Sequence, residues 1–140
     1  IIGGVNFIAL DNSYYKFTKS QWEFVKKEFK KGLPVVLMCH IPFYSTSQCE
    51  YALKQSKGKC ASLIGAPDSI TSQYSEARKE QQQADQITLD FIEWLRKQTK
   101  LKAIISGHCH YNFVADFSET AKQFTVGALF NGDAYEFEIR

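Results

Sequence analysis

The sequence predicts an α/β fold in which a mixed β-sheet carries helices on at least one face. Short apolar runs alternate with amphipathic, helix-periodic segments along most of the chain, a pattern typical of strands joined by helices. The run at residues 35–39 is apolar without interruption, as in strands buried on both faces. Near its end the chain instead alternates apolar and polar residues, which indicates antiparallel strands. With 140 residues, 44% of them hydrophobic, the chain has the size and composition of one globular domain.

The first strand and helix have clear boundaries. A strand is expected at residues 5–10, and a helix from Thr18 to about Lys31. Thr18 and Gln21 have the spacing of a capping box, in which each side chain bonds the other residue's main chain. Gly32 closes the helix. The apolar positions that recur at helical spacing, and so should face the sheet, are Trp22, Val25 and Phe29.

The middle of the chain is polar. Residues 45–83 are rich in Ser, Gln, Lys and Gly without a clear period, so we expect a lid-like insertion there. A second amphipathic helix is predicted at 84–98 and a strand at 102–106. The apolar stripe predicted for this helix consists of Ile87, Phe91, Trp94 and Leu95.

The end of the chain is predicted to be an antiparallel ribbon. Strands are expected at 113–116 and 124–126. Asn131-Gly132 is a strong hairpin signal, and it would join a strand at 128–130 to one at 135–139. Apolar and acidic residues alternate in this last strand, as expected of a strand with one buried face.

Charge and hydropathy exclude two classes of partner. The net charge is +2, with lysines interleaved among acids, which gives no nucleic-acid-binding signature. No apolar stretch approaches the roughly 20 residues of a membrane helix. The compartment is not determined, although the cytoplasm is favoured. Because the chain begins at Ile1 and enters a strand almost at once, we expect it to be part of a larger protein.

Two of the four cysteines lie beside histidines at predicted strand ends. Side chains alternate along a strand, so Cys39 and Cys109 should point away from the face that their histidine neighbours use, and we expect buried thiols. Cys49 and Cys60 lie in the polar segment and could pair in an oxidising compartment. The sequence leaves this pairing open.

The three histidines are the candidate chemical centre. His40 follows the strand at 35–39, and His108 and His110 follow the strand at 102–106. In open α/β sheets ligands bind outside the carboxyl ends of the strands, so we expect the three imidazoles to meet there and hold metal. Gly107 would let the chain turn tightly towards the site. One shared ion and two ions roughly 3.5–4 Å apart are both compatible with the spacing.

Two motifs carry a family resemblance. Residues 106–110, Ser-Gly-His-Cys-His, resemble the Gly-His-x-His motif of the calcineurin-like metallophosphoesterases. Residues 38–42, Met-Cys-His-Ile-Pro, resemble the strand-end histidine that precedes it in this family. The order of the motifs, the gap of about 70 residues between them and the alternating strands and helices are also similar. The resemblance extends over nearly the whole chain.

The resemblance implies a fold and an activity. The fold would be a four-layer αββα sandwich of two mixed sheets with helices outside, of which this chain is the C-terminal half. Two divalent ions (Mn, Fe or Zn) would be bound, one by His40 and His108 and the other by His110. A metal-activated hydroxide would hydrolyse phosphate mono- or diesters. Neutral imidazole is a suitable ligand for such metals.

The chain also departs from the family. The Asp-x-His, Gly-Asp-x-x-Asp and Asn-His-Asp/Glu motifs do not occur in it. The resemblance therefore implies that an N-terminal half of the same domain supplies the bridging carboxylate, the Asn ligand and the general acid, and that this chain contains no catalytic general acid. Asp133 mimics one motif only superficially and is not expected to bind metal. With half of the ligands missing, metal should be held weakly.

Substrate contacts and alternative functions stay open at this point. Phe43 and Tyr44 could line a cleft for the phosphate ester or simply pack, and Asn112 could bind substrate or cap a turn. Lysines of the polar segment are expected on a solvated face, with phosphate contact as the alternative; these are Lys54, Lys57 and Lys59. The alternative functions are a mononuclear three-histidine zinc hydrolase, and a non-catalytic fragment or interaction domain whose histidines stay empty.

Overall fold

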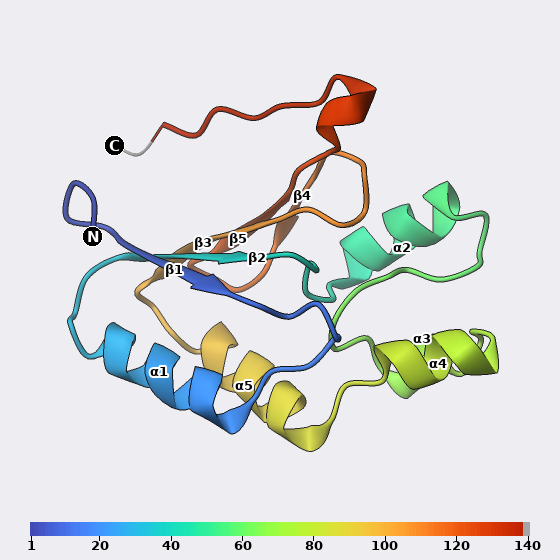
Figure 1. The fold of residues 1–140 in the computed structure, drawn as a ribbon, viewed down its shortest axis with the longest axis horizontal. Helices are drawn as coiled ribbons and strands as arrows, with labels where there is room; N and C mark the ends of the chain where they lie inside the picture. Colours follow the sequence, from blue (N-terminus) through green and yellow to red (C-terminus); the bar gives the residue numbers. More distant parts are fainter. Residues whose placement is uncertain (139–140) are drawn as a thin grey trace.

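The computed structural model describes residues 1–138, which form a mixed α/β structure with one five-stranded sheet and flanking helices (Figure 1). The strands are β1 (Asn6–Leu10), β2 (Val35–Cys39), β3 (Leu101–Ser106), β4 (Phe113–Asp116) and β5 (Lys122–Thr125). Their order is β1-β2-β3-β5-β4; all neighbours pair in parallel except β4, which is antiparallel to β5. This confirms the predicted mixed sheet. Residues 1–138 do not form the second sheet of the expected four-layer sandwich.

Two helices, α1 (Lys19–Phe29) and α5 (Gln86–Arg96), lie side by side against one face of the sheet (Figure 1). The predicted capping box at the start of α1 is confirmed. The Thr18 hydroxyl accepts the main-chain N–H of Gln21, and the side-chain oxygen of Gln21 accepts the N–H of Thr18 at 2.8 Å. The predicted stripe of α1 is also confirmed, because Val25 is fully buried and its other two members pack against the core.

The buried face of α5 is shifted by one residue from the prediction at its N-terminal end. Phe91 and Leu95 are fully buried and Trp94 packs on the core, as expected, but Ile87 is 40% exposed. Thr88 is buried in its place. Its hydroxyl accepts the main-chain N–H of Phe17 at 2.8 Å, and this contact accounts for a polar residue on the inner face of the helix.

The polar segment at 45–83 has more structure than the sequence predicts. It contains helices α2 (Thr46–Gln55), α3 (Asp68–Thr71) and α4 (Glu76–Gln82). The helical period is weak because the helices are short and bury polar side chains, including Gln48 at 0% and Gln82 at 1% exposure. Its role as a lid stays a prediction. No helix within residues 1–138 is both long and apolar enough to cross a membrane.

The predicted C-terminal hairpin is wrong. Residues 129–131 form a short 3-10 helix, η1 (Leu129–Asn131), and Gly132 ends it in the left-handed region with φ +84°. Residues 133–138 contain no strand. Their contacts are made by side chains instead: the ring centroids of Phe137 and Phe124 lie 5.3 Å apart. Residue 139, the last of the expected strand, lies outside the described residues.

The other face of the sheet is apolar. Strand residues that alternate with the core-facing ones point to this side, among them Phe7, Val36 and Ile105, and they line an open pocket of about 820 Å³. In Figure 1 the C-terminal segment runs along this side, whereas α1 and α5 cover the opposite face. In β2, residues 35–37 are buried and Met38 is 36% exposed, so most of this strand is covered on both faces, as its uninterrupted apolar run predicts.

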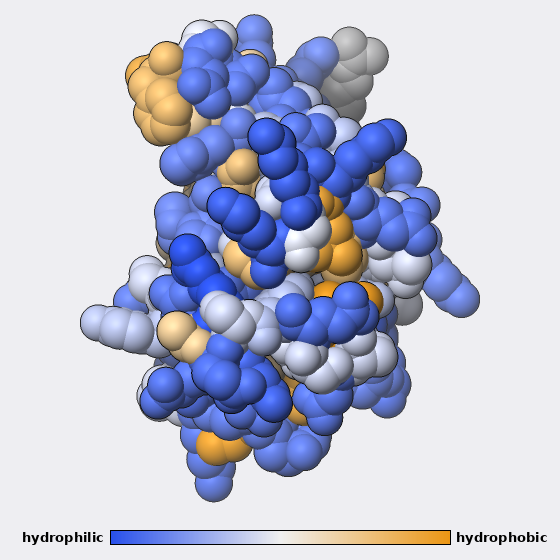
Figure 2. All heavy atoms as spheres, turned by 90° about the vertical axis from the view of Figure 1, so that its right-hand side faces the viewer, coloured by the Kyte–Doolittle hydropathy of each residue, from blue (hydrophilic) through white to orange (hydrophobic). Residues whose placement is uncertain are grey.

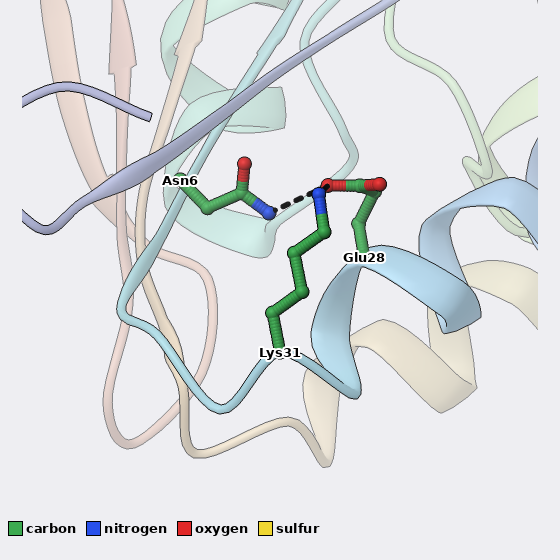
Figure 3. A network of polar contacts seen from close by, with 3 residues as sticks. All are labelled: Asn6, Glu28 and Lys31. Carbon is green, nitrogen blue, oxygen red and sulfur yellow. Dashed lines mark hydrogen bonds and ion pairs between the residues drawn. The ribbon is translucent and has the colours of Figure 1, made fainter.

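A polar cluster ties β1 to the end of α1 (Figure 3). One carboxylate oxygen of Glu28 accepts the side-chain N–H of Asn6 at 2.9 Å and the Lys31 ammonium at 2.6 Å. These two hydrogen bonds, that of Lys31 first, lower the pKa of the Glu28 carboxyl from its ordinary value of 4.5.

This shift makes the stabilisation by Glu28 depend on pH. Because the folded-state pKa is below the unfolded one, the stabilisation is present above pH 4.5 and is lost as pH falls through the folded-state pKa. We expect the difference in urea midpoint between the wild type and Glu28→Gln to shrink between about pH 6 and about pH 3. The same comparison in a Lys31→Gln background is the control: it lacks the first-named hydrogen bond to Glu28, so the midpoints should converge less there.

Candidate metal centre

His40 and His108 meet at the carboxyl edge of the parallel strands. His40 follows β2 and His108 lies just beyond β3, and the hydrogen bond from the N–H of Gly107 to the carbonyl of His40, 3.0 Å, extends the pairing of these strands. His108 Nδ1 lies 3.0 Å from His40 Nε2. Figure 2 faces the side of the molecule at which these strands end, and its surface is largely hydrophilic.

His110 does not join this pair. Its ring stands edge-on to Phe130, with the ring centroids 5.1 Å apart. The expectation that His108 and His110 point to one side assumed an extended chain, but both have positive φ, 64° and 57°. Within residues 1–138, no group of three or more His, Cys, Asp or Glu side chains is arranged to hold a metal ion.

Three non-glycine residues in left-handed conformation converge beside the pair. They are Tyr15 (φ 59°), Ser62 (φ 54°) and His108 (φ 64°). The Tyr15 hydroxyl lies 2.8 Å from His108 Nε2, and the Ser62 side chain interacts with Tyr15. Such conformations cost about 1–3 kcal/mol each and cluster at functional sites. Sequence reasoning missed Tyr15, because its contact with His108 spans 93 residues and has no local signal.

Burial keeps both members of the Tyr15–His108 contact neutral at neutral pH. It raises the pKa of the Tyr15 phenol to about 12. It is also the largest cause of the lowered pKa of His108, followed by the charges of His40, His110 and Arg78. Neutral imidazole is the form that binds metal. If Nε2–H donates to the Tyr15 oxygen, the lone pair of Nδ1 faces His40.

Two buried carboxamides hold the loop that carries His40. Asn12 donates to the carbonyl of Ile41 at 2.8 Å and accepts its N–H at 2.9 Å. Gln123, on β5, donates to the carbonyl of Phe43 and accepts its N–H, both at 2.8 Å. Each side chain thus satisfies both main-chain groups of one loop residue, as a neighbouring strand would. No local sequence pattern marks these two side chains, because their bonds to the loop span 29 and 80 residues.

The three substrate-binding candidates have structural contacts. Phe43 is fully buried, with its ring stacked on Phe17, so it packs in the core and cannot line a cleft. Tyr44 is half-buried and packs against the cluster around α2. Asn112 accepts the N–H of Gly127 at 2.6 Å and donates to Asp133 at 2.9 Å. These bonds join the loop before β4 to the segment after β5 and do not cap a local turn; a substrate contact of Asn112 stays a prediction.

The thiols are free and mostly buried. All four cysteines are unpaired. Burial raises the pKa of Cys39 to about 12 and that of Cys109 to about 11. Cys60 and Cys109 line a pocket of about 220 Å³ next to His108, together with Ser62 and Tyr111. No Asp or Glu contributes to the lining of this pocket.

Comparisons with known proteins find similarity to solved structures but none to known sequences. No family model matches the chain, and no curated protein matches it. Among solved structures, the crystal structure of a dimetal phosphatase from Danio rerio is similar, with 15% sequence identity and a TM-score of 0.47. The match covers 81% of this chain and 27% of that one, so the chain spans about a quarter of the length of that protein.

Proposed function

We propose that this chain is part of a metal-dependent phosphoesterase, in which His40 and His108 bind one divalent ion at the carboxyl edge of the sheet. The observation that carries the proposal is the 3.0 Å separation of His40 Nε2 and His108 Nδ1, in segments that resemble the histidine motifs of the metallophosphoesterases. The left-handed backbone of His108 and its contact with Tyr15 support the same conclusion.

The donor set fits a divalent ion. His40 Nε2 and His108 Nδ1 would hold the ion; they lie 3.0 Å apart, within hydrogen-bonding distance of each other, and both are imidazole nitrogens, which suit such ions. A bound divalent ion supplies Lewis acidity at the phosphoryl oxygens and lowers the pKa of water. Tyr15 fixes the ring orientation and tautomer of His108, as outer-shell partners of metal-binding histidines do. Asn12 and Gln123 hold the loop of His40 in place.

Two nitrogens do not complete a catalytic site. We assign the remaining ligands and the general acid to an N-terminal half of the same domain, and His110 to a second ion of the Mn, Fe or Zn type. The open apolar pocket on this face of the sheet, lined by Phe7, Val36 and Ile105, offers a packing surface for that half. Burying such a face would remove a large apolar area from water.

A non-catalytic interaction domain is the second candidate. It is favoured by the lack of any group of three potential ligands within residues 1–138, together with the open apolar pocket on the sheet. The third reading, a mononuclear three-histidine zinc site, is disfavoured because the ring of His110 stands against Phe130. Metal binding by the isolated chain separates the first two readings.

Calorimetric titration of this chain with Mn²⁺ or Zn²⁺ is the test. We expect weak binding that falls at least about tenfold in His40→Gln, because one of two ligands is lost. His110→Gln is the matched control and should change this affinity less than about threefold. Equal losses in both variants would contradict the assignment of the His40–His108 pair. Failure of the wild type to bind any divalent ion would favour the interaction domain.

A further inference from the structure

The pocket beside His108 adjoins a second, larger pocket. The first has a volume of about 220 Å³ and the second about 680 Å³, and both are lined by Gln55, Ser56 and Cys60. Their shared wall comes from the end of α2 and the loop that follows it, and the start of α4 completes the outer part. In Figure 1, α2 and α4 stand beside the edge at which the parallel strands end. The two pockets lie next to each other, with His108 in the lining of the first, and we call the two together the groove.

The outer part of the groove is positively charged. It is lined by Lys57, Lys59 and Arg78, and neither pocket has an Asp or Glu in its lining. Among the described residues, none of these three cations forms an ion pair. Other surface lysines do, such as Lys122 with Asp116 at 2.8 Å. The charge of Arg78 also acts on Tyr15 and His108, so the positive potential extends to the histidine site.

The inner part of the groove is neutral and has an unused hydrogen-bonding group. Its walls carry the thiols of Cys60 and Cys109 and the hydroxyls of Ser62 and Tyr111. The Tyr111 hydroxyl is buried and has no hydrogen-bond partner within residues 1–138. Because this hydroxyl is itself buried, a molecule bound in the inner pocket contacts the ring of Tyr111 rather than its hydroxyl.

We propose that this groove binds a second phosphate group of the substrate, so that the substrate is a phosphate ester with another phosphate on a neutral, polar organic portion. The substrate assignment rests on the proposed phosphoesterase function. The scissile phosphate lies at the His40–His108 pair and the organic portion lies in the neutral inner pocket beside Tyr111. The second phosphate lies among Lys57, Lys59 and Arg78. Arginine suits this position because its planar guanidinium donates two parallel hydrogen bonds to one phosphate.

Binding to the metal-free chain tests the groove without requiring catalysis. Two probes that differ by one phosphate, fructose 6-phosphate and fructose 1,6-bisphosphate, are titrated by calorimetry at low ionic strength. We expect the bisphosphate to bind at least about tenfold more tightly, and Lys57→Gln/Lys59→Gln/Arg78→Gln to abolish this preference. A control with the same change of net charge is Lys19→Gln/Lys27→Gln/Lys30→Gln on α1, which should keep the preference. Circular dichroism verifies that both triple variants fold.

The outcomes separate this inference from the proposed function. Equal affinity for the two probes, or equal loss in the two triple variants, would overturn the groove, because net charge alone would then explain binding. If divalent ions fail to bind while the preference persists and depends on Lys57, Lys59 and Arg78, the phosphoesterase proposal fails and the anion-binding groove stands.

Discussion

Replacing Gln123 by alanine is expected to lower the free energy of unfolding by about 3–5 kcal/mol. The side chain is buried at 1% exposure. It bonds the N–H and the carbonyl of Phe43 and donates to Gln48 Oε1 at 2.6 Å. Truncation leaves three buried polar groups without partners, each at a cost of roughly 1–3 kcal/mol, and also opens a cavity.

Urea unfolding at neutral pH measures this effect. Gln73→Ala is the matched control, because that glutamine is exposed and bonds only the carbonyl of Ser69 within its own segment; it should change stability by less than about 0.5 kcal/mol. Gln123→Glu keeps the shape of the side chain but loses the donor that Phe43 and Gln48 require, so it should also be strongly destabilising. A loss of less than about 1 kcal/mol in Gln123→Ala would mean that water satisfies the loop.

Strand β2 and the start of helix α1 could be predicted because the residue patterns that mark them are local in the sequence. The uninterrupted apolar run gave β2 at Val35–Cys39, and Thr18 with Gln21 gave the start of α1. The helices of the segment 45–83 could not be predicted in this way, since they bury polar side chains such as Gln48. Gln48 is satisfied by Gln123 and by Thr125, which are more than 70 residues away in the sequence.

Some features of the candidate site could likewise be predicted from the sequence, and others could not. The proximity of His40 and His108 follows from two parallel strands that end at one edge, which is a property of sheets in general. The direction of the His110 side chain depends on the positive φ of His108 and His110. Nothing in the sequence around them predicts this conformation, which is uncommon for residues other than glycine. Tyr15 and Gln123 act through contacts across 93 and 80 residues, so no local pattern marks them.

His108→Gly is expected to abolish phosphoesterase activity with little loss of stability, in a protein that contains this chain together with its N-terminal half. An outer-shell partner of a metal ligand is worth about 10–100-fold in affinity or activity, so removal of the ligand itself should cost at least about a hundredfold in kcat/KM. Glycine also relieves the left-handed strain of His108 at φ 64°. The free energy of unfolding should therefore stay within about 1 kcal/mol of the wild type.

The contrast between a large loss of activity and a small change in stability distinguishes a metal ligand from a structural histidine. Loss of the 2.8 Å hydrogen bond to Tyr15 lowers stability and so opposes the relief of strain. In a Tyr15→Phe background this bond is already absent, so His108→Gly there measures the effect of the backbone strain on the free energy of unfolding. A structural histidine would lose stability and activity together, and full activity in His108→Gly would refute the metal assignment. His108 holds a left-handed backbone conformation at φ 64°, which costs about 1–3 kcal/mol. A substitution that removes this strain together with the imidazole therefore separates the effect on stability from the effect on activity.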